Sequence, residues 1–195
     1  MTSPLNHASL LLVQFLFDFF LTMVLLRLLL QSVRANFYNP IGQFIIRVTD
    51  PVLTPLRRFI PSISGVDMAS IILLFVTELL KLLFMHIISY HNVPYPAGLL
   101  IWTIGDLLRA LINVFFYAIL LQMILSWISP DPRQPLTQLL YRLTEPLLAL
   151  ARRYVRPIGG IDISPVPVML ILQLALILLA NPLSNFGAMM ALSLP

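Results

Sequence analysis

The sequence predicts an all-α membrane protein with four transmembrane helices from two parallel repeats. Three observations lead to this fold class. Hydrophobic residues make up 59% of the 195-residue chain and charged residues only 10%, well below the roughly 25% of soluble domains. Four stretches reach the ~20 apolar residues that a bilayer crossing requires. In addition, one half of the chain repeats the other at a constant offset of 95 residues.

The four apolar stretches are expected as spans at about 8–30, 68–90, 96–128 and 163–186. The first lacks a basic n-region and a small-residue cleavage site, so we expect it to remain as a span. The third exceeds one crossing, so we expect it to tilt or to begin at the interface.

Basic residues predict the orientation of the spans. Nine of the 12 Lys and Arg lie in two segments, residues 31–67 and 130–162, and the tails and the short turn near residue 91 have none. Because basic loops stay on the cytoplasmic side, both segments are expected to be cytoplasmic and both termini outside.

The repeat is clearest in these basic loops. Of the 28 positions from Pro40 to Asp67, 11 are identical to their counterparts from Pro135 to Asp162. We therefore expect two repeats, residues 1–95 and 96–195, each built as span, basic loop and span. Two crossings separate equivalent points, so the repeats have the same orientation.

Each loop is predicted to form a pair of short amphipathic helices in the headgroup region. Apolar residues recur at helical spacing from Ile41 to Val48, and Pro51 should end this helix and open the next. The second loop repeats the pattern, and both apolar faces are expected to lie toward the membrane. Gly65 and Gly160 then allow a turn, and Asp67 and Asp162 are expected to cap the next span.

Polar residues inside the spans form the first candidate site. The offset places Asp18 opposite Asn113, Arg27 opposite Gln122, and Glu78 opposite Gln173. Polar groups within a membrane usually face a bundle interior, so we expect one intramembrane cluster made of Asp18, Glu78, Lys81, Asn113, Gln122 and Gln173.

Two interpretations of this cluster remain open: hydrogen bonds that fix helix packing, and a cation or proton path. Glu78 and Lys81 are three residues apart, as are Asp106 and Arg109, so each acid is spaced to neutralise its neighbour. Asp18 could instead pair with Lys81 or Arg109 across helices.

Arginines of the loops form the second candidate site, comprising Arg47, Arg57, Arg58, Arg142, Arg152 and Arg153. One interpretation is anchoring to anionic lipid headgroups, and the other is a docking face for a cytoplasmic protein partner. Nucleic acid is not expected, because no base-stacking platform accompanies the arginines. The sequence has no cysteine and no catalytic motif, so we expect neither an enzyme, a metal site nor a cofactor.

The segment DPVLTPLRRFIPSISGVD at Asp50–Asp67, its second copy at Glu145–Pro165 and FYNP at Phe37–Pro40 resemble the YggT (YlmG-like) family. The second copy departs from the pattern at Glu145, at Leu150 and at Arg156-Pro157. The resemblance implies a bacterial inner-membrane protein that aids osmotic or salt stress adaptation, through or alongside cation (potassium) transport. The alternative is a membrane scaffold or assembly factor for cell division or cytochrome maturation. A homo-oligomer is compatible with so small a bundle.

Overall fold

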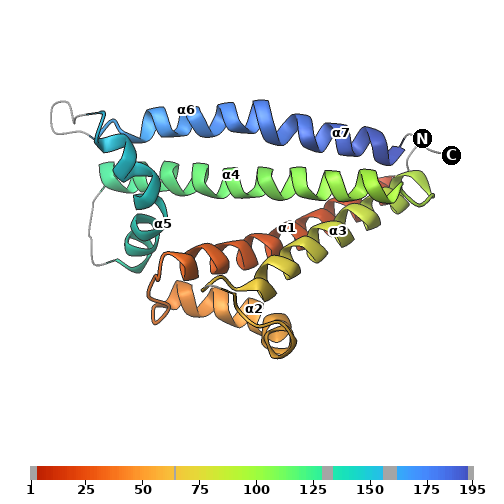
Figure 1. Cartoon of the computed structure of the whole chain (residues 1–195), viewed down its shortest axis with the longest axis horizontal. Helices are drawn as coiled ribbons and strands as arrows, with labels where there is room; N and C mark the ends of the chain where they lie inside the picture. Colours follow the sequence, from red (N-terminus) through yellow and green to blue (C-terminus); the bar gives the residue numbers. More distant parts are fainter. Residues whose placement is uncertain (1–3, 64, 129–133, 156–161, 193–195) are drawn as a thin grey trace.

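The computed structural model describes residues 4–63, 65–128, 134–155 and 162–192. Apart from one isolated bridge between Ile63 and Val66, the regular elements in these ranges are helical (Figure 1). In chain order they are α1 (Pro4–Ser32), α2 (Pro40–Phe59), α3 (Met68–Tyr90), α4 (Pro96–Ile128), α5 (Pro135–Arg152), α6 (Pro165–Ala175), the π-helix η1 (Leu176–Ala180) and α7 (Asn181–Leu192).

Four helical segments in the described part of the chain are long and apolar enough to cross a membrane: α1, α3, α4 and the continuous α6–η1–α7. This confirms the four expected spans. The last one runs from Pro165 to Leu192, beyond the expected end at residue 186. Pro182 does not end it: the π-helical turn just before this proline loosens the hydrogen-bond ladder where the proline ring would otherwise clash.

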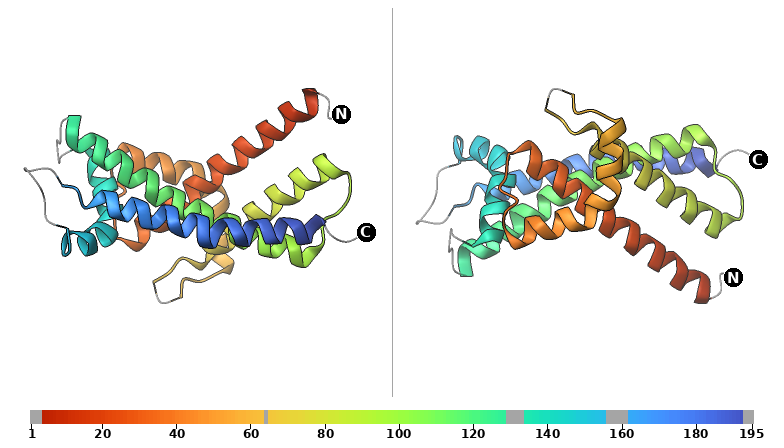
Figure 2. Two further views of the ribbon diagram at one scale, coloured as in Figure 1. Left: turned by 90° about the horizontal axis from the view of Figure 1, so that it is seen from above. Right: turned by 90° about the horizontal axis from the view of Figure 1, so that it is seen from below.

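The helices are arranged as two pairs. Figure 1 shows α4 running alongside α6–α7, with α1 and α3 crossing below them at an angle. The two termini and the connection from α3 to α4 lie at one end, and α5 lies at the other. Both α1 and α4 start at the end with the termini, as parallel repeats require. In both views of Figure 2 the N-terminal part of α1 projects away from the other helices.

The loops differ from the expected pairs of short helices. Each forms one helix, α2 and α5, and Pro51, Pro55 and Pro146 lie inside these helices. An interior proline removes one backbone hydrogen bond and bends a helix, but the bonds on either side can continue it. Figure 1 shows α2 changing direction along its length, which fits this explanation.

In the described residues, three connections between helices turn at a residue with positive φ, namely Arg34, Gly65 and His91. Arg34 ends α1 at a backbone φ of 52°, with Ala35 N–H donating to the Leu30 carbonyl and Arg34 N–H to that of Gln31. These are the two bonds of a Schellman motif. Gly65 has a φ of 82°, as its predicted turn requires, whereas Gly160 lies outside the described residues.

The two aspartates expected to cap spans behave differently. Asp67 caps α3, and its carboxylate accepts a hydrogen bond from Ser70 N–H. Asp162 does not cap α6, which begins at Pro165 with Ser164 at the capping position. Since Pro165 has no N–H to offer, Asp162 accepts instead from Ser164 N–H at 2.9 Å.

Helices α4 and α7 approach each other closely through glycines. A Cβ added at Gly187 would lie 2.3 Å from the Trp102 nitrogen, and one at Gly98 would lie 2.3 Å from the Ala191 nitrogen. Small residues that admit close backbone contact are the usual basis of helix association in membranes. The second repeat is therefore tightly held at the end where the termini lie.

We expect Gly187→Ala to lower the free energy of unfolding by about 1–3 kcal/mol, because the added methyl overpacks this contact. Equilibrium unfolding in mixed micelles would measure it. Met189 is 70% exposed, so Met189→Ala on the same helix is the control and should change stability by about 0.5 kcal/mol or less. A Gly187→Ala variant as stable as the wild type would contradict the close approach.

Candidate functional site: a cavity between the repeats

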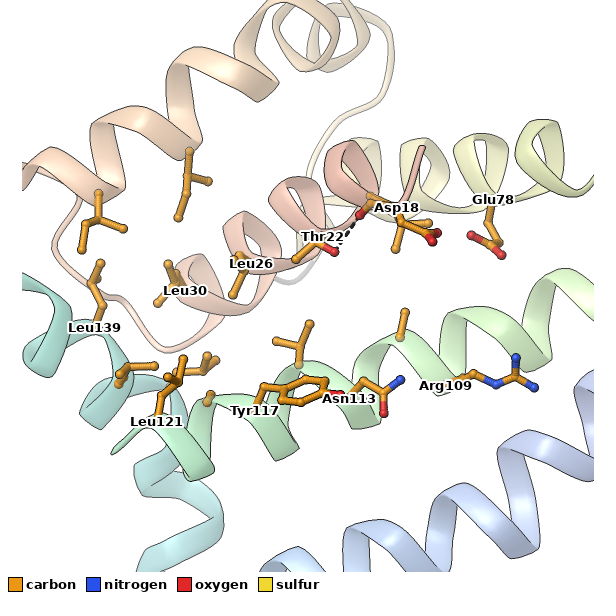
Figure 3. Close-up of a pocket in the computed structure, with 18 of the residues that line it drawn as sticks. Asp18, Thr22, Leu26, Leu30, Glu78, Arg109, Asn113, Tyr117, Leu121 and Leu139 are labelled. Atoms are coloured by element: carbon orange, nitrogen blue, oxygen red, sulfur yellow. Dashed lines mark hydrogen bonds between the residues drawn. The ribbon is translucent and has the colours of Figure 1, made fainter. Parts of the chain in front are cut away.

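A cavity of about 580 Å³ lies between the two repeats, mainly between α1 and α4. Equivalent positions of the two repeats line it in pairs, and Figure 3 shows several of them on facing helices. The pairs are Gln14 and Arg109, Asp18 and Asn113, Thr22 and Tyr117, Leu26 and Leu121, Ile41 and Leu136, and Ile45 and Leu140. Equivalent positions of the two halves of the duplication therefore form part of the cavity wall.

One end of the cavity is charged. Lys81 Nζ donates a hydrogen bond to Asp18 Oδ1 at 2.8 Å and lies 2.7 Å from Glu78 Oε1. The Glu78 side chain is only 1% exposed, whereas that of Asp18 is 45% exposed. One ammonium thus links a carboxylate of its own helix to a carboxylate of α1, which settles the partner of Asp18 that the sequence left open.

Helix α4 contributes a second charged pair to the cavity. Arg109 Nη1 lies 3.2 Å from Asp106 Oδ1, which also accepts a hydrogen bond from Ser184 Oγ of α7 at 2.6 Å. Buried Arg109 Nε has no hydrogen-bond partner among the described residues. A polar species in the cavity would satisfy this donor, because buried donors are rarely left unpaired.

The other end of the cavity is apolar. Asp18 lies fourteen residues from either end of α1, about 21 Å at ~1.5 Å per residue, so the charged end is near the middle of that span. Leucines and isoleucines fill the part toward α2 and α5 (Figure 3), contributed by Leu26, Leu30, Ile41, Ile45, Leu121, Leu136, Leu139, Leu140 and Leu143.

Two residues of the expected cluster lie elsewhere. Gln122 accepts a hydrogen bond from Thr144 of α5, and Gln173 is on α6, outside the lining of this cavity. The cavity brings together Asp18, Glu78, Lys81 and Asn113, and it adds Asp106 and Arg109, which were not in the predicted cluster.

Gln122 instead belongs to a tie between span and loop that occurs in both repeats. In the first repeat, Arg27 Nη1 donates to Thr49 Oγ1 at 2.6 Å and Arg27 Nη2 lies 2.7 Å from Asp50 Oδ1. Gln122 and Thr144 are the equivalent positions in the second repeat. Thr49 and Thr144 are identical residues at equivalent positions of the repeats. The 95-residue offset could therefore have identified these positions.

The repeated arginine pairs divide into an inner and an outer member. Arg57 Nε donates to Asp67 Oδ2 at 3.1 Å, and Arg152 Nε donates to Asp162 Oδ2 at 2.9 Å. We call these two contacts the arginine clasps. Arg152 also pairs with Glu145 at 2.8 Å, because Gln122 at the position of Arg27 carries no charge to engage that acid.

The clasps hold their aspartates in the charged form. Burial alone would raise the pKa of Asp67, but hydrogen bonds from Arg57 and Ser70 outweigh it and hold this pKa below its ordinary value of 3.8. For Asp162, burial is likewise outweighed by hydrogen bonds from Ser164 and Arg152, and the pKa is lowered. Each clasp thus fixes the loop helix to the residues that lead into the next span.

The other four arginines of the candidate site are exposed. Arg47, Arg58, Arg142 and Arg153 make no ion pair within the described part of the chain. Arg57 and Arg152 therefore stabilise the fold, and of the six candidate arginines the other four remain available to a lipid or a partner. Arg133 and Arg156, also counted among the loop arginines, lie outside the described residues.

Comparisons with known proteins agree with these repeats. The chain is 40% identical over 186 residues to the uncharacterized protein PA0392 of Pseudomonas aeruginosa, covering 95% of this chain and 94% of that one. It is 33% identical over 174 residues to the uncharacterized protein YggT of Escherichia coli K12, covering 89% of each. No solved structure matches the chain.

A family model described as CCB3/YggT matches the chain twice, over residues 7–88 and 101–183. These segments fall in the two expected repeats, and together they cover most of the chain. The relatives carry no described activity. On the double match and the identity to relatives along nearly the whole length, this chain belongs to the CCB3/YggT family.

Proposed function

We propose that the cavity between the repeats is a binding site for a monovalent cation, and that the protein aids osmotic or salt stress adaptation through or alongside cation transport. Potassium and protons are the first candidates. The observation that carries the proposal is the group Asp18–Lys81–Glu78, which sits in a cavity near the middle of the spans. Ionisable side chains at that depth are costly, and where they occur they usually mark an ion pathway.

The composition of the charged end favours a cation over an anion. Three carboxylates face two basic side chains there, so one negative charge remains when all five are ionised. A cation that enters would compete with the Lys81 ammonium for Asp18 and Glu78. The Asn113 amide, which lines the same cavity, would add a neutral oxygen ligand.

The apolar end favours a closed site over an open pore. Leucine and isoleucine side chains from α1, α2, α4 and α5 line the cavity between its charged end and the loop helices. Apolar walls of this kind disfavour the entry of water and ions. Passage through the protein would therefore require a movement of α2 and α5 relative to α1 and α4.

Ion flux into proteoliposomes tests the proposal. We expect potassium or proton flux above that of empty vesicles, and at least a tenfold loss in an Asp18→Asn, Glu78→Gln double variant. Gln173→Leu is the matched control, because this residue is polar and intramembrane but lies outside the cavity, and its flux should equal that of the wild type. Wild-type vesicles no leakier than empty ones would overturn autonomous transport.

The exposed arginines favour a second candidate, a membrane scaffold or assembly factor. In this proposal α2 and α5 lie in the cytoplasmic headgroup region, and Arg58 and Arg153 engage anionic lipid or a cytoplasmic partner. Charge reversal at these two positions should then abolish function in cells, whereas Asp18→Asn should be harmless. The cation proposal predicts the opposite sensitivities, so the same strains separate the two.

A further inference from the structure

A second cavity lies beside the loop helices, away from the charged group within the spans. Its chemistry is that of an anion site. It has a volume of about 540 Å³ and lies between the connection that follows α1 and the first half of α5. Its polar lining comes from both repeats: Arg34, Asn36 and Asn39 from the first, and Thr137, Gln138, Tyr141 and Arg142 from the second.

The groups that line this cavity are mainly donors. Two guanidinium groups, one hydroxyl and one phenol accompany the Asn36 amide, whose oxygen already accepts from Tyr38 N–H, so that its NH₂ is left to donate. The Asn39 oxygen is likewise engaged by Gly42 N–H. No carboxylate is among the described residues of the lining. Planar guanidinium donors match the oxygens of a phosphate group.

Arg34 occupies its position against local preference. It ends α1 in the left-handed backbone region, at the place in the Schellman motif that glycine usually takes. A side chain there costs about 1 kcal/mol relative to glycine. The backbone conformation therefore does not favour arginine at this helix end, and its side chain lines the cavity.

We propose that this cavity binds a phosphate group, supplied either by the headgroup of an anionic phospholipid or by a soluble phosphate. Arg34 and Arg142 would each contact the phosphate oxygens, with Asn36, Thr137 and Tyr141 as neutral donors. Because one arginine comes from each repeat, the bound group would tie the connection after α1 to α5. The inference is independent of the cation proposal, since it concerns other residues and a ligand of opposite charge.

Binding to the full chain in detergent tests this inference with two probes, phosphatidylglycerol counted by native mass spectrometry and inorganic phosphate followed by calorimetry. We expect saturable binding of at least one probe. Each arginine should contribute about fivefold, so an Arg34→Gly, Arg142→Gln double variant should bind about 25-fold more weakly. Binding of phosphatidylglycerol alone would identify a lipid headgroup as the source, and binding of both probes would identify phosphate itself.

The comparison variant is Arg58→Gln, Arg153→Gln, which removes the same charge from the exposed positions where the scaffold candidate places its lipid contacts, at the far ends of α2 and α5. At physiological salt these distant charges are largely screened, so affinity should fall by twofold or less. Arg34→Gly should also leave the melting temperature unchanged or raise it, which separates lost binding from lost folding. Equal losses in both double variants, or no saturable binding of either probe, would overturn the site.

Discussion

Replacing Lys81 with methionine is expected to lower the free energy of unfolding by about 3–5 kcal/mol. The Lys81 side chain is 10% exposed and is the ion-pair partner of both Asp18 and Glu78. Without it, the 1% exposed carboxylate of Glu78 would stay within the span with no cation beside it. Methionine keeps most of the volume of the lysine chain, so the loss would report the charge. Equilibrium unfolding in mixed micelles measures the effect.

Neutralising both acids should reverse most of this loss. A triple variant, Lys81→Met with Asp18→Asn and Glu78→Gln, has no charge left in the group and is expected within about 1.5 kcal/mol of the wild type, since a neutral replacement of a buried ion pair is often tolerated. A single Lys81→Met variant with wild-type stability would contradict the ion pairs described here. A triple variant as unstable as the single one would show that lysine acts through packing.

The spans could be predicted from the sequence because their physical requirement is simple. A bilayer crossing needs a long apolar stretch, and α3 begins and ends at the predicted residues 68 and 90. The loops were harder. A proline inside a short amphipathic stretch normally suggests a helix boundary, yet α2 continues through Pro51 and Pro55. Local sequence does not report whether the surrounding packing compensates for one missing hydrogen bond.

The candidate site was predictable where the duplication constrains it. Asp18 and Asn113 are equivalent positions, and both line the cavity between α1 and α4. Gln173 is equivalent to Glu78 but does not line it, and Leu176 stands where the first repeat has Lys81. A buried carboxyl group needs a cation or a proton to neutralise it, whereas an amide has no such requirement. The second repeat could therefore place its glutamine elsewhere.

The arginine pairs show what a repeated motif leaves undecided. Arg57 and Arg58 recur together as Arg152 and Arg153, so the repeat alone gives no reason to separate them. The useful signal was the aspartate that follows the inner arginine by ten residues in both copies. The ten-residue spacing could not be interpreted from the sequence alone, because it is the turn at Gly65 that brings the two side chains together.

The clasps make a prediction that distinguishes neighbouring arginines. Arg57→Gln should lower the free energy of unfolding by about 1.5–3 kcal/mol, the range for hydrogen bonds to a charged group, because Asp67 is 5% exposed and loses its cation. Arg58→Gln removes the same charge from the next, exposed residue and should cost about 0.5 kcal/mol or less. Equal effects of the two variants would mean that the arginines act only through total charge.

Acid should remove the difference between Arg57→Gln and the wild type. The pKa of Asp67 is lower in the folded protein than its ordinary value of 3.8, so the clasp stabilises the fold above that value and is lost as the pH falls through the folded pKa. Unfolding curves of the two proteins should therefore converge as the pH falls below 3.8 and through the folded pKa of Asp67. Arg152→Gln should have the smaller effect at neutral pH, because Asp162 is 39% exposed and solvent screens that pair. If the difference in stability between Arg57→Gln and the wild type persisted unchanged in acid, Arg57 would act through the packing of its aliphatic chain and not through its ion pair.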